Sequence, residues 1–422
     1  MKYHRRVIDV TLDDLFPNLA AIALEGAKGV GKTATASQRA ATILSLNSPN
    51  ERAALAGNLD LITQVSPPVL IDEWQLEPAV WDRVRRAVDD DSRGGQFLLA
   101  GSAGVAPGVR IHSGAGRIVS LRMRPLSIHE RGIDDPTVSL RELIRGQPGP
   151  IGGHTDVDLP TYVDEILQSG FPGIRGLADR ARDVQLDSYV LRMVDHELAE
   201  NGFRVRRPAA LRAWLTAYAA ATATDASYTR ILDAATPGES EKPTRQSVAV
   251  YREHLQRIFI LDSVEAWAPA FAPLKRLTRT PKHHLVDPAI AARLVGVGKD
   301  GLLRGRGGRF PCPSTWLGAL FESLVTQSVR VYASACDARI GHLRTQDTEH
   351  EIDLVVEGHD HTCVAIEVKL SDSVDAADVR HLNWLRGQLG DRLVDRVIVC
   401  TGRFAYRRPD GVAVVPLALL GP

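Results

Sequence analysis

A glycine-rich run near the amino terminus contains the residue types that hold a triphosphate. The pattern G-x-x-x-x-G-K-[ST] is matched at every fixed position by Gly26, Ala27, Lys28, Gly29, Val30, Gly31, Lys32 and Thr33. Glycines let the backbone curl so that successive N–H groups face the phosphates. Lys32 would neutralise charge on the β- and γ-phosphates, and the Thr33 hydroxyl would hold Mg²⁺. The run predicts a site for ATP and Mg²⁺, since a glycine turn used only for packing would not explain Lys32 and Thr33.

Two adjacent acids close an apolar run of strand length further along the chain. The run over 69–73 ends in Asp72 and Glu73. Asp72 would reach Mg²⁺ through its water shell, and Glu73 would orient and deprotonate the attacking water as a general base. Two solvated acids at the end of a strand are the alternative interpretation.

Two further polar residues could meet the γ-phosphate. Ser102 follows an apolar run over 97–101, at the place where a polar sensor residue commonly meets that phosphate. Arg117 could contact the phosphate within the chain or from a neighbouring subunit, which would contribute about 10³–10⁵ in rate. An ordinary surface arginine is the alternative interpretation of Arg117.

The elements that must position these residues are those of an α/β domain with a parallel sheet. Between residues 7 and 127, short apolar runs alternate with helical stretches. The sequence predicts strands over 22–26, 68–74 and 96–103, and a helix over 34–44. A stretch over 145–160 that is rich in glycine and proline then predicts a linker or an exposed loop.

The rest of the chain divides into a helical region and a second α/β region. Residues 162–267 show mostly helical periodicity, and Thr244 is the predicted N-cap of one of these helices. The order of helix, turn, helix and short strand is similar to a winged helix-turn-helix, with two packed core helices as the alternative. Near the carboxyl end we expect helices over 317–334 and 375–390 and strands over 351–358, 363–370 and 394–402.

A second set of charged residues falls on these carboxyl-terminal elements. Asp353 precedes Glu367 by fourteen residues, Lys369 follows two residues later, and Glu322 lies on the upstream helix. This layout resembles the PD-(D/E)XK nuclease-like fold. The resemblance implies that Asp353 and Glu367 ligate Mg²⁺, that Lys369 activates water, and that Glu322 completes the metal shell. Charged side chains that serve only the solubility of an exposed sheet face are the alternative.

The order of short segments along the chain resembles a large prokaryotic ATPase family of the AAA+ superfamily. Members of that family fuse a P-loop core to a carboxyl-terminal conserved domain of unknown function. The matching segments are GAKGVGKT, LIDEWQ, FLLAGSA, GAGR, 121–127, 170–173, 285–288, 318–322, EIDLVVE and AIEVK. The chain departs from the family pattern with Ala103 in place of a second small polar residue and with Lys28 where arginine is common. Neither departure affects the expectation of nucleotide binding.

Composition limits the classes of protein that remain. Lys and Arg number 51 and so do Asp and Glu, which excludes a uniformly basic coat for nucleic acid. Nine Lys or Arg against two acids between 275 and 309 could still form a local phosphate-contacting patch, or a solvated loop balanced by acids elsewhere. No apolar run has membrane-spanning length and no signal peptide is evident, which predicts a cytoplasmic protein without membrane contact.

These observations predict an α/β protein with a P-loop NTPase core of AAA+ type. We expect that core over 1–130, a helical region with a winged helix-turn-helix over 155–270, a basic connecting segment over 271–316 and a nuclease-like α/β domain over 317–422. The expected function is Mg²⁺-dependent ATP hydrolysis that switches the contacts of the carboxyl-terminal domain with duplex DNA or a protein partner. Whether that domain cleaves DNA or is catalytically silent stays open at this point, as does the oligomeric state.

Overall fold

The structure is a computed structural model, and it describes residues 3–103, 113–147, 149–203, 205–236, 244–270, 277, 280–304, 313–347 and 349–422. The chain divides into two units that each draw on separate stretches of sequence. Unit 1 comprises Met1–Arg124, Arg192–Arg206 and Tyr251–Ile260. Unit 2 comprises Pro125–Leu191, Arg207–Val250 and Leu261–Pro422.

Unit 1 is a parallel sheet between helices. Its strands are β1 (Ala21–Glu25), β2 (Thr42–Ser45), β3 (Val69–Asp72), β4 (Phe97–Gly101) and β5 (Ile118–Arg122). Its amino-terminal helices are α1 (Val7–Leu15), α2 (Lys32–Ser37), α3 (Pro49–Gly57), α4 (Leu61–Gln64) and α5 (Ala79–Asp90). A later stretch adds a π-helix over Met193–Glu197 and the short α11 (Leu198–Glu200).

The strand order β2-β3-β4-β1-β5 brings the predicted nucleotide residues to one edge of the sheet. All four strand pairs are parallel, so every strand ends at the same edge. The glycine-rich run follows β1, the paired acids close β3, and Ser102 follows β4, which lies between them. The parallel sheet predicted for this part of the chain is confirmed.

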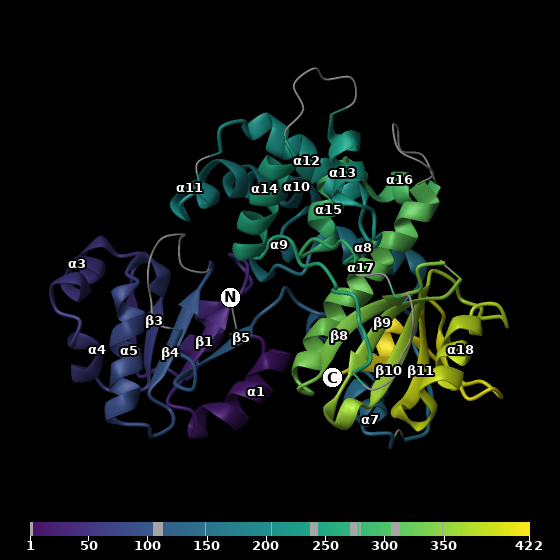
Figure 1. Ribbon diagram of the computed structural model, residues 1–422, viewed down its shortest axis with the longest axis horizontal. Coiled ribbons are helices and arrows are strands. Elements are labelled where there is room, and N and C mark those ends of the chain that lie inside the picture. Colours follow the sequence, from purple (N-terminus) through teal and green to yellow (C-terminus); the bar gives the residue numbers. More distant parts are fainter. Residues whose placement is uncertain are drawn as a thin grey trace. The chain divides into compact units, whose positions relative to one another are not determined.

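Both faces of this sheet are buried, which explains why its strands are continuous apolar runs. On β1, Ala21 and Ala23 belong to a cluster with residues of α3, α4 and α5. Ile22 and Leu24 belong to a second cluster with residues of α1 and α2. Successive side chains of a strand point to opposite faces, so the two clusters lie on the two sides of the sheet. Figure 1 shows the strands of this sheet between α5 and α1.

The prediction of one helix over 34–44 is wrong in its second half. Helix α2 ends at Ser37, and residues 42–45 form the edge strand β2. Thr42 pairs with Val69 and Ser45 with Asp72, so tertiary pairing with β3 decides the conformation of this short run. The strands predicted over 22–26, 68–74 and 96–103 are confirmed as β1, β3 and β4.

Unit 2 joins a group of helices to a mixed sheet. Its helices are α6 (Ile128–Arg131), α7 (Leu140–Ile144), α8 (Leu159–Gln168), α9 (Pro172–Arg175), α10 (Asp179–Arg192), α12 (Pro208–Ala220), α13 (Tyr228–Ala235), α14 (Arg245–Arg257), α15 (Pro288–Val295), α16 (Lys299–Arg304), α17 (Pro313–Ser334) and α18 (Arg380–Leu389). The last residues of α10 and α14 are counted with unit 1. Its strands are β6 (Val138–Ser139), β7 (Gly153–His154), β8 (Arg339–Arg344), β9 (Glu351–Glu357), β10 (Cys363–Lys369), β11 (Leu393–Cys400), β12 (Phe404–Arg407), β13 (Ala413–Pro416) and β14 (Leu420–Gly421).

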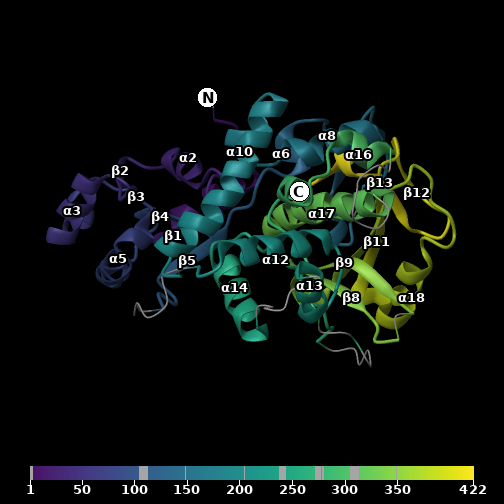
Figure 2. The ribbon, with the colours of Figure 1, turned by 90° about the horizontal axis from the view of Figure 1, so that it is seen from above.

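The main sheet of unit 2 has seven strands in the order β7-β12-β13-β11-β10-β9-β8. Strands β8, β9 and β10 pair antiparallel, and β11 pairs parallel to both β10 and β13. Helix α18 packs on one face through Leu382, Leu385 and Leu389, and the long helix α17 contacts β8 and β10 (Figure 2). The helices and strands predicted near the carboxyl end are confirmed as α17, α18, β9, β10 and β11.

Several strands of this sheet were not predicted, because they are short or polar. The sequence of β8 is Arg-Ile-Gly-His-Leu-Arg, and β12 is mostly exposed. The stretch predicted as a linker contributes β7, whose two exposed residues pair with β12. These segments are extended because they pair with neighbouring strands, and their own sequences carry no strand pattern.

The helical middle follows the predicted order of elements. Thr244 caps α14, since its side-chain oxygen accepts a hydrogen bond from the Ser247 N–H at 3.1 Å. Isolated antiparallel bridges join Leu261 to Leu285 and Val264 to Lys282. The winged helix-turn-helix stays a prediction. In the described parts of the chain, no helix combines the length and apolar character needed to cross a membrane.

Candidate functional site

The glycine-rich run forms a tight loop between β1 and α2. The Lys32 ammonium lies inside this loop, 2.8 Å from the Gly26 carbonyl oxygen and 3.0 Å from that of Ala27, and donates to both. Burial lowers the pKa of Lys32 to about 8, and the carboxylates of Glu73 and Asp72 oppose that shift. A desolvated ammonium in this position interacts more strongly with a phosphate than an exposed one would.

Glycine is required at two points of the loop. A Cβ on Gly26 would lie 2.1 Å from the carbonyl oxygen of Met123, so any other residue would force the chain away from β5. Gly31 precedes α2 with φ of 103°, in a region that residues with side chains rarely adopt. The pattern of glycines in the sequence therefore corresponds to a backbone path that other residues could not follow.

The two elements of the predicted metal site meet at this edge. The Thr33 hydroxyl donates a hydrogen bond to Asp72 Oδ1 at 2.8 Å. Asp72 is the last residue of β3 and is buried, and this burial raises its pKa, while the hydrogen bond from Thr33 opposes the rise. A hydroxyl and a carboxylate oxygen in contact are ligands of the hard type that Mg²⁺ takes, so these residues fit the ion.

Glu73 is held in place by its backbone and by two side chains. Its φ of 54° and ψ of 43° are left-handed, which is uncommon for a residue other than glycine and is often found at functional sites. Ser102 donates a hydrogen bond to Glu73 Oε2 at 3.1 Å, and the Gln75 amide donates to the same oxygen. The contact of Ser102 with Glu73 and the part played by Gln75 were not predicted from the sequence.

Arg117 does not reach this site within the chain. It precedes β5, and β5 runs parallel to β1 with Ile118 opposite Ala21, so Arg117 lies at the edge of the sheet where strands begin. The loop follows Glu25, about 15 Å further along the strand direction. Arg117 instead donates to Asp89 at 2.8 Å. This placement does not support contact with the γ-phosphate within the chain, and a role from a neighbouring subunit stays a prediction.

An arginine near the amino terminus forms a hydrogen bond with the backbone of the glycine-rich loop. The guanidinium of Arg6 is buried and donates to the Val30 carbonyl oxygen at 3.0 Å and to that of Arg124 at 2.9 Å. It thereby ties the glycine-rich loop to the residues that follow β5. The sequence offered no signal for this contact, because 24 residues separate Arg6 from Val30.

Lys28 of the loop is paired with a residue from a distant part of the chain. Glu197, at the end of the π-helix, forms an ion pair with the Lys28 ammonium. Burial would lower the pKa of Lys28, but the hydrogen bond and the charge of Glu197 outweigh it and raise that pKa. π-Helical turns are rare and occur frequently at functional sites.

We expect Glu197→Gln to tighten ATP binding about two- to five-fold, because a half-exposed ion pair contributes about 0.5–1 kcal/mol. The substitution removes the carboxylate that competes with phosphate for Lys28, which is half exposed. Calorimetric titration with ATP and Mg²⁺ measures the change. Asp91→Asn, which removes a carboxylate that pairs with Arg93 instead of Lys28, is the control and should leave the affinity unaltered. Weaker binding by Glu197→Gln would show that the pair supports the loop.

The second predicted constellation is brought together only in part. Asp353 lies on β9 and Glu367 on the adjacent β10, and both are buried. Their carboxyl groups share a hydrogen bond, and burial together with the charge of Asp353 raises the pKa of Glu367 well above its usual range. Glu322 is buried beside Asp353, and its pKa rises to about 8 for the same two reasons.

Lys369 does not join these carboxyl groups. Its ammonium lies 3.7 Å from Asp378, and one third of its side chain is exposed. A different lysine, Lys282, occupies the cluster: its ammonium is 2.7 Å from Asp353 Oδ1 and 2.8 Å from Glu322 Oε1. Lys282 is one of the nine basic residues between 275 and 309, and its sequence pattern did not predict a place among these carboxyl groups. In the described part of the chain, no group of three or more side chains is arranged to hold a metal ion.

The basic segment does not form a free phosphate-binding patch where it is described. Lys282 is buried, Arg293 pairs with Asp187 and Asp183, and Lys299 pairs with Asp164. These residues are balanced by acids of the fold. The positions 275, 276, 279, 306 and 309 and the side chain of residue 304 lie outside the described residues.

Three of the family-like segments meet in a buried polar network of unit 2. The Leu126 N–H donates to the Gly170 carbonyl oxygen at 2.7 Å, and the Gly170 N–H donates to Asp287 Oδ2 at 2.7 Å. The Gln327 amide donates to the same Asp287 oxygen at 3.3 Å. These contacts lie within unit 2 and give the three segments a structural role.

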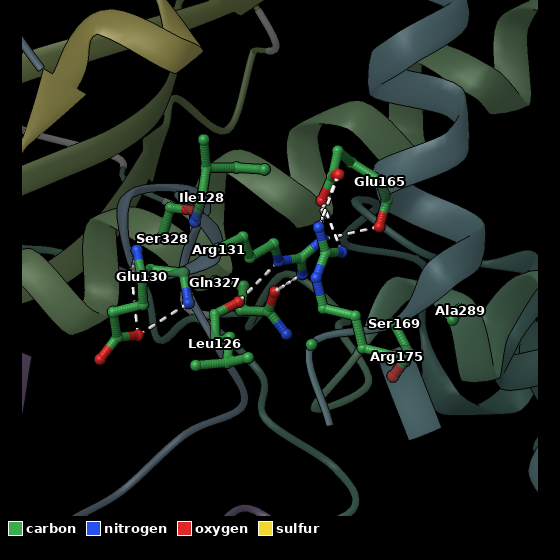
Figure 3. Close-up of polar contacts among 12 residues, drawn as sticks. Leu126, Ile128, Glu130, Arg131, Glu165, Ser169, Arg175, Ala289, Gln327 and Ser328 are labelled. Atoms are coloured by element: carbon green, nitrogen blue, oxygen red, sulfur yellow. Dashed lines mark hydrogen bonds and ion pairs between the residues drawn. The ribbon is translucent and has the colours of Figure 1, made fainter. Parts of the chain in front are cut away.

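Arg131 is at the centre of this network. Figure 3 shows its guanidinium directed toward Leu126, Glu165 and Gln327. It donates to the Leu126 carbonyl oxygen at 2.9 Å, to the Glu165 carbonyl oxygen and carboxylate at 2.6 and 3.1 Å, and to Gln327 Oε1 at 2.9 Å. Arg175 donates to both carboxylate oxygens of Glu165, at 2.7 and 2.8 Å. The Arg131 side chain is fully buried, so its charge depends on these partners.

Three family models match separate parts of the chain. An AAA domain matches residues 18–131, and domains of unknown function, DUF8612 and DUF4143, match residues 159–301 and 317–420. No curated protein matches the chain.

Among solved structures, the Walker-type ATPase of Pyrococcus abyssi is 14% identical and has a TM-score of 0.39. The match covers 68% of this chain and 94% of that chain. A RuvB mutant of Thermotoga maritima is 16% identical with a TM-score of 0.25, over 60% of this chain and 86% of that chain. Residues 18–131 are thus similar to an AAA domain, which supports ATP binding by the glycine-rich loop, and residues 159–301 and 317–420 are similar to two domains of unknown function.

Proposed function

We propose that unit 1 hydrolyses ATP with Mg²⁺ and that its nucleotide state acts as a switch for the contacts of the rest of the chain. The observation that carries this proposal is the meeting of three groups at the carboxyl edge of one parallel sheet. They are the buried ammonium of Lys32, the Thr33–Asp72 pair and the restrained carboxylate of Glu73.

Lys32 and the loop backbone bind the phosphates in this proposal. The ammonium now donates to two carbonyl oxygens of its own loop, and a triphosphate oxygen offers a charged acceptor in their place. A phosphate oxygen carries negative charge and a carbonyl oxygen does not, so the ammonium is attracted more strongly to the nucleotide. Gly26 and Gly31 keep the loop in the path that allows this approach.

Thr33 and Asp72 would hold Mg²⁺, and Glu73 would act on water. When bound, the ion supplies positive charge that neutralises the phosphate oxygens. Ser102 and Gln75 donate to one oxygen of Glu73 and so leave the other free of these two donors. That arrangement fixes the direction in which the carboxylate can accept a proton.

The switch part of the proposal names duplex DNA or a protein as the partner. Within the basic segment over 275–309, the described Lys282, Arg293 and Lys299 are paired with acids, so the charge of this segment does not favour DNA. The charged cluster of unit 2 contains an internal lysine, which favours the version in which that module is catalytically silent. ATP turnover with and without duplex DNA distinguishes the two partners.

Calorimetric titration of ATP at millimolar Mg²⁺ tests the site. Lys32→Ala should weaken binding about 100-fold, because hydrogen bonds between charged groups contribute about 1.5–3 kcal/mol each. Arg93→Ala is the control in the same unit, since the Arg93 side chain is mostly exposed and pairs only with Asp91 among the described ion pairs. Equal affinity of Lys32→Ala and wild type would remove the basis of the proposal.

A further inference from the structure

A lysine ammonium lies at the centre of the carboxyl cluster in unit 2. Lys282 Nζ is 2.7 Å from Asp353, 2.8 Å from Glu322 and 3.1 Å from Glu351. These acids come from α17 and β9, and Lys282 comes from a third segment that is bridged to Val264. Only 3% of the Lys282 side chain is exposed.

The ammonium offers its donors to the carboxyl groups around it and forms hydrogen bonds with two of them, Asp353 and Glu322. It has three N–H donors, and three carboxyl groups lie within ion-pair distance of it. A buried charge is retained only when it is paired in this way. A magnesium ion between Asp353 and Glu322 would need their oxygens at about 2.0–2.1 Å, in the volume that the ammonium now takes.

A second observation indicates that this cluster is built around a cation. Oε1 of Glu367 is buried and has no hydrogen-bond partner among the described residues. Leaving a buried polar atom without a partner costs about 1–3 kcal/mol, so such atoms usually have a reason to be there. Ile366 of β10 pairs with Leu354 of β9, so Glu367 lies next to Asp353, one of the acids that hold Lys282.

The side chains present therefore do not fit the metal that the nuclease-like resemblance implies. The lysine expected to serve that chemistry, Lys369, lies beside Asp378 instead. A divalent ion would have to enter next to a fixed positive charge that the fold already buries, and like charges at short range repel strongly in a buried site. Nothing in this conflict depends on ATP or on unit 1.

We propose that Lys282 is a tethered counter-ion that occupies the cation position of this carboxyl cluster and prevents unit 2 from binding a divalent metal there. The cluster is thus a latent metal site that a single side chain fills. Metal-dependent phosphodiester cleavage is then excluded at these residues as long as Lys282 stays in place. The module acts through binding or through its structure.

Mn²⁺ is the probe, and the full chain without nucleotide is titrated while electron paramagnetic resonance reports free Mn²⁺. Wild type should show no binding that depends on Asp353. Lys282→Met, which keeps the length of the side chain and removes its charge, should gain one Mn²⁺ per chain with at least ten-fold tighter binding than wild type. Adding Asp353→Asn to this variant should abolish the gain, which separates the cluster from Thr33 and Asp72.

Lys299→Met is the matched control, because Lys299 lies in the same part of the chain but is half exposed on α16. It should bind Mn²⁺ as wild type does. If Lys282→Met does not fold, a melting temperature restored by Mn²⁺ but not by Na⁺ would support the proposal. Two results would overturn it: Mn²⁺ binding by wild type that Asp353→Asn removes, or a folded Lys282→Met chain that binds no additional Mn²⁺. The comparison of wild type with Asp353→Asn tests the proposal without any substitution of Lys282.

Discussion

Replacing Glu73 by glutamine should lower the rate of ATP hydrolysis about 10²–10⁴-fold and leave ATP binding nearly unchanged. The glutamine has the same shape and can still accept a hydrogen bond from Ser102, which lies 3.1 Å from Glu73 Oε2. It cannot accept a proton from water at neutral pH. The variant should therefore lose the chemical step. It should keep the phosphate-binding loop, because this loop follows β1 whereas Glu73 follows β3.

Steady-state turnover and calorimetric titration of the same preparations separate these two effects. A short 3₁₀ turn over Trp74–Leu76 separates Glu73 from Glu77. Glu77→Gln is the matched control, because Glu77 makes no contact with the glycine-rich loop among the described residues. It should hydrolyse ATP at the wild-type rate. If Glu73→Gln keeps full activity, the general base lies elsewhere. If the variant also loses ATP binding, the left-handed backbone at Glu73 has a structural function.

Replacing Arg131 by alanine should destabilise unit 2 by about 3–5 kcal/mol, the usual cost of breaking a buried ion pair. Arg131 is fully buried and satisfies Leu126, Glu165 and Gln327 together. Without it, Glu165 keeps only Arg175 as an ionic partner among the described residues, and the Leu126 carbonyl oxygen loses its donor. The Leu126 carbonyl oxygen and Gln327 Oε1 would each lose a hydrogen bond in the interior, and this further lowers the free energy of unfolding.

Urea unfolding followed by far-ultraviolet circular dichroism measures this change. A chain of two units need not unfold in one step, so the transition of unit 2 is the one to compare. Arg131→Lys should recover only part of the stability, because an ammonium cannot reproduce the planar arrangement of guanidinium donors. Arg180→Ala, at an exposed position of α10 in unit 2, should show no measurable change. An Arg131→Ala chain as stable as wild type would show that water replaces the guanidinium.

How much of the site could be predicted depended on the distance in sequence between its parts. The loop from Gly26 to Thr33 is one continuous run whose conformation requires glycine, so its pattern is visible without any tertiary information. Asp72 and Glu73 follow an apolar strand, and a parallel sheet of that type brings strand ends to one edge. The predictions for these residues required only local patterns and one rule of topology.

The position of Arg117 in the sheet could not be predicted from local patterns. Its segment occurs at the expected place in the chain, but the register of β5 against β1 puts it at the opposite edge of the sheet. Register is set by packing and pairing along the whole strand. A residue next to a strand can therefore be recognised from sequence without revealing which site it serves.

The sequence by itself determined the chemistry of the ATP site, because contiguous residues define the loop and the acids. Only the tertiary structure decided which side chains neutralise which charges. Lys282 and Asp353 are 71 residues apart, Lys28 and Glu197 are 169 apart, and Arg131 and Glu165 are 34 apart. The physical reason is that the attraction between two charges depends on their distance and on their surroundings, and both exist only after the separate segments have packed.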